Sequence, residues 1–158
     1  MTADAPPPPG APPSGPARAL PPALLAVGIG CRSGVTANAV ARLVEDALAR
    51  VPGPLLTSPL LGLFTVAGKE QEPALSEAAA RLGLALVYLP RDTLKAFAAA
   101  TETRSERVVA LFGVPSVAEA AALAGAGAGG TLVLPRISAE GVTCAVAATG
   151  FSLGTILS

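Results

Sequence analysis

The sequence predicts an α/β domain with a largely parallel sheet and one antiparallel edge. Short apolar runs alternate with segments of helical periodicity through most of the 158 residues, as in sheets built from strand–helix–strand units. The run 23–29 is apolar without alternation, which is typical of a strand buried on both faces. Two apolar runs near the end flank a turn at 138–141 and predict an antiparallel hairpin.

Each expected element has its own signal. The segment 37–50 carries apolar residues on one helical face and stops before Pro52-Gly53-Pro54. The segment 73–82 begins with a proline and is followed by Gly83, the pattern of a helix start and end. Ser116-x-x-Glu119 is a capping box at the start of a later helix. In full, we expect strands at 23–29, 60–66, 84–89, 107–112, 131–134 and 142–147, and helices at 37–50, 73–82, 92–100 and from 115 onward.

The two ends of the chain are expected to lie outside this domain. The first 22 residues hold nine of the sixteen prolines and no periodic apolar face, a composition that favours an extended, solvated tail. No uninterrupted apolar run follows a basic start there, so we do not interpret it as a secretory signal. We therefore predict a disordered proline-rich tail at 1–22, one domain at 23–150 and a C-terminal tail at 151–158.

Composition argues against several classes of partner. The formal net charge is zero and only 14% of residues are charged, so the basic stripe of a nucleic-acid binder is missing. No apolar run in the sequence approaches the roughly 18 residues of a membrane-spanning helix. Two cysteines do not make a disulfide framework and suit a reducing compartment. We expect a cytoplasmic protein that binds neither nucleic acid nor membrane.

The chain contains no histidine, and this restricts the chemistry of any active site. A Ser-His or Cys-His pair is impossible, and no imidazole is present to ligate a metal. Two cysteines also fall short of the four nitrogen or sulfur ligands of a structural zinc site. Acid–base steps would fall to Asp, Glu, Lys, Cys, Tyr or the substrate. We therefore expect no metal and no cofactor.

The first candidate site is the stretch 28–34, GIGCRSG, at the end of the first expected strand. Ligands of α/β sheets usually bind at the carboxyl ends of strands. The spacing Gly28-x-Gly30-x-x-x-Gly34 is one residue longer than the dinucleotide fingerprint, and no acid ends the second strand. No Gly-Lys-Ser/Thr occurs in the sequence either, so neither nucleotide motif is supported.

Two functional interpretations of this loop remain beside a purely structural one. Cys31 precedes a helix and adjoins Arg32, features that lower a thiol pKa, but without histidine its activation as a nucleophile is incomplete. Alternatively, the N–H groups of 33–37 and the Arg32 guanidinium bind an anion. The structural interpretation is a glycine turn with Arg32 in solvent, and the residues alone do not decide between these.

Three other stretches supply candidates. Lys69 lies between a strand and a helix and suits a substrate carboxylate, while Glu72 suits either a base or the cap of that helix. Ser116 is expected mainly to cap a helix, and it is also a candidate contact of the ligand. Arg136 lies beside a strand end, where it is either solvated or part of the site.

Four stretches in this order resemble the CobE/CbiG C-terminal-domain family of cobalamin biosynthesis: GIGCRSG, KEQEPAL, GVPSVAEAAAL and GVTCAVA. The resemblance extends over about 24–147. It implies a three-layer α/β/α domain with a mixed, mostly parallel sheet of about five or six strands, and a part in building the corrin ring. Longer CbiG proteins are associated with opening the ring-A lactone of cobalt-precorrin-5A and releasing acetaldehyde. This chain lacks their N-terminal portion and resembles the stand-alone CobE form, and it has Arg136 where relatives often have lysine.

Chemistry and resemblance agree on a ligand rich in carboxylates. Corrin precursors carry many acetate and propionate side chains, so a binder needs spaced cations and backbone donors. We expect a protein that binds a corrin or precorrin intermediate and acts as its carrier or assists ring-A lactone opening. One alternative is a hydrolase in which water attacks, Glu72 is the base and Lys69 or Arg32 stabilises negative charge. Another is a non-catalytic module that docks on other corrin-pathway enzymes. The expected ligand-binding residues are Gly28, Gly30, Cys31, Arg32, Gly34, Lys69, Ser116 and Arg136.

Overall fold

The computed structural model describes residues 23–97 and 116–150 of the chain. Three predictions therefore lie outside the described residues: the proline-rich tail at 1–22, the strand at 107–112 and the tail at 151–158. The start of the last predicted helix at Pro115 also lies outside them.

The elements of the described residues follow the predicted order. The strands are β1 (Leu25–Cys31), β2 (Leu60–Val66), β3 (Leu86–Leu89), β4 (Thr131–Ala139) and β5 (Val142–Ala148). The α-helices are α1 (Ala37–Ala49), α2 (Pro73–Leu82), α3 (Arg91–Ala96) and α5 (Val117–Ala126), and a short 3-10 helix covers Gly53–Leu55. β2 and α2 match their predicted bounds residue for residue, whereas β4 runs five residues beyond the predicted end at 134.

The strands form one mixed sheet in the order β3-β2-β1-β5-β4. β1, β2 and β3 are parallel neighbours, while β5 is antiparallel to both β1 and β4. The predicted mixed α/β sheet is confirmed, but parallel pairing is limited to the β1–β3 part. The predicted hairpin is β4–β5, and its two turn residues, Glu140 and Gly141, have φ of 53° and 81°. Such a turn matches the right-handed twist of the two strands.

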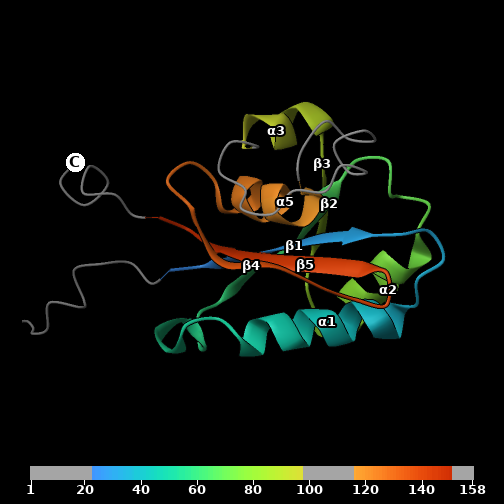
Figure 1. Cartoon of the computed structure of the whole chain (residues 1–158), viewed down its shortest axis with the longest axis horizontal. Helices are drawn as coiled ribbons and strands as arrows, with labels where there is room; N and C mark the ends of the chain where they lie inside the picture. The colour runs from blue at the N-terminus through green and yellow to red at the C-terminus, as the bar shows by residue number, and fades with distance from the viewer. Residues whose placement is uncertain (1–22, 98–115, 151–158) are drawn as a thin grey trace, which may run out of the picture.

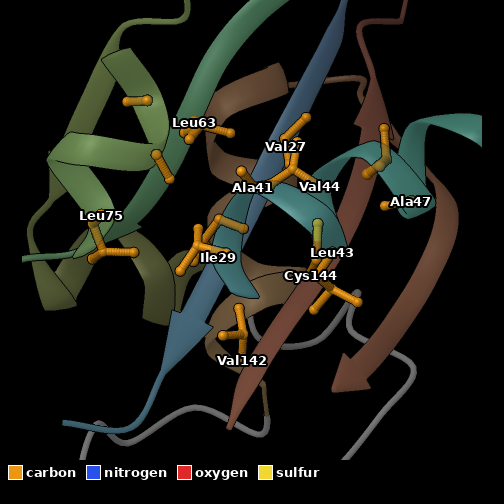
Figure 2. Close-up of a cluster of buried hydrophobic side chains, with 14 of the residues drawn as sticks. Val27, Ile29, Ala41, Leu43, Val44, Ala47, Leu63, Leu75, Val142 and Cys144 are labelled. Atoms are coloured by element: carbon orange, nitrogen blue, oxygen red, sulfur yellow. The ribbon is translucent and has the colours of Figure 1, made fainter. Parts of the chain in front are cut away.

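The helices cover both faces of the sheet, which gives the expected three layers. α1 and α2 lie on one face, and α5 with α3 lies on the other (Figure 1). On the α1 face, Val27 and Ile29 of β1 pack with Leu43 and Val44 of α1 in a cluster of buried apolar side chains (Figure 2). This cluster is the larger part of the core.

The opposite face of β1 carries only small residues, because Ala26, Gly28 and Gly30 alternate with the large ones. A methyl group at Gly28 would overlap the carbonyl oxygen of Ala118 and lie 2.5 Å from the nitrogen of Ala122, both in the α5 backbone. α5 therefore lies directly on the backbone of β1. The first two glycines of GIGCRSG thus belong to the strand and have a packing reason for their lack of a side chain.

None of the helices in residues 23–97 and 116–150 is long and apolar enough to cross a membrane.

The contact between α5 and β1 predicts a large stability loss in Gly28→Ala. Because the obstructing atoms are helix backbone, α5 must move, and overpacking of this kind costs about 1–3 kcal/mol or more. Urea unfolding followed by circular dichroism measures the change in free energy.

Gly30→Ala is the matched control on the same strand and face. Its nearest obstruction is a side-chain atom, Oγ1 of Thr143 at 2.6 Å from the added carbon, which can rotate at the cost of its 3.2 Å hydrogen bond to the carbonyl oxygen of Gly30. We expect a smaller loss in Gly30→Ala than in Gly28→Ala, and equal losses would contradict the packing argument.

Candidate functional site

Two loops meet at the carboxyl ends of β1 and β2, at the right of the view in Figure 1. The Nζ atom of Lys69, in the β2–α2 loop, donates a hydrogen bond to the carbonyl oxygen of Cys31 at 2.8 Å. A second hydrogen bond has its donor in the β1–α1 loop: the N–H of Gly34 donates to Oε1 of Glu72 at 3.2 Å. The structure thus brings together four of the predicted site residues from two stretches that are 38 residues apart.

Local interactions fix the β1–α1 loop before any ligand is considered. The N–H of Arg32 donates to the carbonyl oxygen of Gly141 at 2.9 Å, which ties the loop to the β4–β5 turn. Gly34 has a φ of 83°, a conformation that glycine adopts without strain. Thr36 is the N-cap of α1, and its Oγ1 accepts the N–H of Ala39 at 3.0 Å. Gly34 and Thr36 therefore shape the chain into the start of α1.

Glu72 has a different structural role from the one expected of a cap. It occupies the N-cap position of α2, but its side chain makes no capping hydrogen bond to that helix. Its carboxylate instead accepts the N–H of Gly34. One N–H of the predicted anion-binding segment 33–37 is therefore already occupied by a carboxylate of the protein.

Arg32 is exposed and lies beside the β4–β5 turn. A methyl group at Gly141 would lie 3.8 Å from both Cβ and Cδ of Arg32, so the side chain runs along the turn. The aliphatic stem of Arg32 therefore lies beside the hairpin, whereas the Lys69 ammonium group lies at the end of β1.

The Cys31 thiol is not activated by its surroundings. Burial raises the pKa of the Cys31 thiol; the charge of Lys69 acts in the lowering direction and that of Glu72 in the raising direction. The direction is opposite to the one expected from a neighbouring arginine and helix start. Burial likewise raises the pKa of Cys144, which is fully enclosed by the core. Both cysteines are free thiols.

Ser116 is the N-cap of α5, as the capping box predicts. Its Oγ accepts the N–H of Glu119 at 3.2 Å, and the residue is buried. The next residue, Val117, lies beside Gly30. Ser116 is therefore near the carboxyl end of β1, on the face of the sheet opposite α1 and α2.

Arg136 lies in an irregular part of β4. The pairing of β4 with β5 shifts register twice, between Leu132 and Leu134 and between Leu134 and Ile137. The N–H of Arg136 donates to Oε2 of the fully buried Glu119 at 2.9 Å. β4 is two strands from β1, or about 10 Å at the usual spacing of strands. The backbone of Arg136 is thus held apart from the contact between Lys69 and Cys31.

Sequence reasoning missed two charged groups. Glu119 appeared only as part of a capping box, although its carboxylate also joins α5 to β4. Arg91 follows β3 almost directly, much as Lys69 follows β2. The signal was a cation just after an apolar strand, the same pattern that had singled out Lys69.

Fold and site together define the class of protein: an α/β/α domain whose polar loops gather at the carboxyl edge of three parallel strands. Residues 25–147 match the family model described as "Cobalamin synthesis G C-terminus". The chain belongs to this family and is a cobalamin biosynthesis protein of the CobE/CbiG type.

Individual relatives agree with this assignment. The chain is 33% identical over 126 residues to Protein CobE from Sinorhizobium sp., a match that covers 78% of this chain and 79% of that protein. It is also similar to the crystal structure of CobE, a protein from the cobalamin (vitamin B12) biosynthetic pathway. The TM-score there is 0.71 at 31% identity, covering 80% of this chain and 91% of the other.

A second solved structure supports the same family. It is the cobalamin biosynthesis protein chiG from Agrobacterium tumefaciens str. C58, with a TM-score of 0.57 and 35% identity. The match covers 78% of this chain and 96% of that one. The resemblance deduced from the four sequence stretches is confirmed.

The surroundings of Cys31 predict slow alkylation at neutral pH. Because burial raises its pKa, the rate of reaction with iodoacetamide should reach half its maximum above the pKa of about 8.5 of an unburied cysteine. Intact-mass measurements between pH 6 and pH 10 follow the reaction, and buried Cys144 should react only after unfolding.

Two charge variants with opposite effects control this experiment. Lys69→Met removes a positive charge that stabilises the thiolate, so the midpoint should rise, whereas Glu72→Gln removes a negative charge and should lower it. A midpoint below pH 8 in the unsubstituted protein would show that Cys31 is activated and would refute this description.

Proposed function

We propose that the protein binds a corrin or precorrin intermediate through the carboxylates of its side chains, and carries it between steps of corrin assembly. The observation that carries the proposal is the pair of contacts between the two loops, Lys69 to Cys31 and Gly34 to Glu72. These contacts hold polar groups of two separate stretches at one edge of the sheet. The ligand class comes from the family, whose members take part in cobalamin biosynthesis.

The chemistry of the edge suits such a ligand. Arg32 offers a planar fork for a carboxylate, and Lys69 offers a compact ammonium group on a long stem. The two lie in different parts of the edge, beside the β4–β5 turn and over the end of β1. Separate cations fit a ligand with several separate carboxylates better than one with a single acidic group.

A hydrolase of the ring-A lactone is the second candidate, because Glu72 is a carboxylate at the same edge as Lys69 and Arg32. In this reaction the oxygen of water bonds to the lactone carbonyl carbon while Glu72 accepts the water proton. The ring C–O bond then breaks, and the released alkoxide becomes the carbonyl group of acetaldehyde as its carbon–carbon bond to the macrocycle breaks. The macrocycle carbon left behind takes up the proton that Glu72 accepted. Lys69 or Arg32 would stabilise the negative charge on the carbonyl oxygen.

A docking module for other enzymes of corrin assembly is the third candidate, and it needs no small-molecule site. We also propose the cytoplasm as the location, since both cysteines are free thiols.

Carboxylate binding predicts that Arg32→Ala and Lys69→Gln each weaken binding of a corrin polycarboxylate about tenfold, or about 1.4 kcal/mol. Affinity is measured from the shift of the pigment's absorption spectrum and from retention of colour on gel filtration. High salt should weaken the binding further, because exposed charges are screened.

Arg50→Ala is the control for this pair. Arg50 caps the C-terminal end of α1, far from the loops. Its exposed guanidinium forms an ion pair with Asp46 at 3.0 Å, and such surface pairs contribute little to stability. Its affinity should equal that of the unsubstituted protein. The binding proposal fails if the unsubstituted protein neither shifts the spectrum nor retains pigment.

Glu72→Gln separates a carrier from a hydrolase. As a carrier, the unsubstituted protein should bind the lactone-containing precursor without releasing acetaldehyde, and Glu72→Gln should still bind it, since no step depends on proton transfer. Enzymatic assay of acetaldehyde and mass spectrometry of the pigment provide the measurement. Acetaldehyde release that Glu72→Gln abolishes would instead establish the hydrolase.

A further inference from the structure

We infer that Arg91 is a third cation of this binding edge and contacts a further carboxylate of the same ligand. The inference rests on the proposed function and extends the site from β1 and β2 to β3.

The topology places Arg91 with the predicted site residues. β1, β2 and β3 are parallel and adjacent, so their carboxyl ends lie along one edge of the sheet. Each strand is followed by a cation: Arg32 comes directly after β1, Lys69 three residues after β2, and Arg91 two residues after β3. One cation per parallel strand therefore lines this edge.

The side-chain geometry brings Arg91 to the β2–α2 loop. Gly68, which directly precedes Lys69, has a φ of 110°, and a methyl group there would lie 3.6 Å from Nη2 of Arg91. The guanidinium thus lies against the backbone of the loop that carries Lys69. From Lys69 the row continues to the end of β1, where its ammonium contacts the carbonyl of Cys31.

Two acidic residues of the same loops accept hydrogen bonds from backbone N–H groups. Oε1 of Glu70 accepts the N–H of Gly68 at 2.7 Å, and Oε1 of Glu72 accepts the N–H of Gly34 at 3.2 Å. Asp92, in the first turn of α3, is the acid next to Arg91 in the chain. Among the described residues, Glu70 and Glu72 therefore each have a hydrogen-bonded position of their own.

The spacing of the row fits a wide ligand. Neighbouring strands lie about 4.8 Å apart, so the ends of β1 and β3 are separated by about 10 Å. A single carboxylate cannot reach all three cations. Carboxylates spread around the rim of a large ring can each meet one, and Arg91 offers a planar, two-pronged contact.

The experiment titrates the full-length protein with two probes. One is a corrin macrocycle with all side-chain carboxylates free, and the other is the same macrocycle with those carboxylates amidated. Arg91→Ala should bind the free-carboxylate form about tenfold more weakly than the unsubstituted protein does, and the amidated form with unchanged affinity. Arg91→Lys, which keeps the charge without the fork, should recover part of the loss.

Arg81→Ala is the matched control, because Arg81 is an exposed arginine in the last turn of α2, away from the carboxyl edge. It should bind both forms normally, and thermal unfolding should show all variants folded. The salt dependence of binding should also be weaker in Arg91→Ala than in the control.

Each other outcome overturns the inference. Undiminished affinity of Arg91→Ala for the free-carboxylate form removes Arg91 from the site and leaves the proposed function intact. An equal loss for both forms, or no recovery in Arg91→Lys, shows a structural role instead of a carboxylate contact. Failure of the unsubstituted protein to bind the free-carboxylate form removes the proposed function and the inference together.

Discussion

The close approach of α5 to β1 is the contact on which the site geometry depends. It requires Gly28 in the strand and alanines in the helix, since a methyl group at Gly28 would overlap the α5 backbone. From Val117 to Leu123 every residue of α5 is buried, so the helix has no free face to shift toward. Its position in turn directs the carboxylate of Glu119 toward β4, where it accepts the N–H of Arg136. A buried carboxylate needs such a partner, because leaving a buried polar group without a hydrogen bond costs about 1–3 kcal/mol, and a charged group costs more.

The hydrogen bond between Arg136 and Glu119 links the position of α5 to the hairpin, and the hairpin in turn contacts the β1–α1 loop. Pro135 has no N–H to donate and, in the irregular stretch of β4, the N–H of the next residue binds Glu119. The hairpin still pairs with β1 through β5. Its turn residue Gly141 then accepts the N–H of Arg32. The orientation of the β1–α1 loop thus depends on a hairpin that lies more than 100 residues further along the chain.

The sequence predicts those parts of the molecule that local signals determine. β2 and α2 match residue for residue, because Pro73 and Gly83 mark the helix and an apolar run marks the strand. β4 continues beyond the predicted end at 134, because it is an edge strand and accommodates Pro135 in its irregular stretch. Lys69 and Glu72 were predicted to lie near the carboxyl ends of the strands, and the structure places them there. The atoms that they contact depend on distances between elements, which periodicity does not contain.

The loop contacts also explain how a chain of zero net charge presents cations at one edge. Net charge counts carboxylates wherever they lie, but the energy of a ligand depends on the charges and donors that face it. Glu70 and Glu72 each accept a backbone N–H within the loops, which holds their carboxylates in fixed directions. Arg32 remains exposed along the β4–β5 turn. Since screening in salt limits exposed charges to short range, within about 10 Å, this local arrangement matters more for a bound carboxylate than the balance of charge over the whole chain.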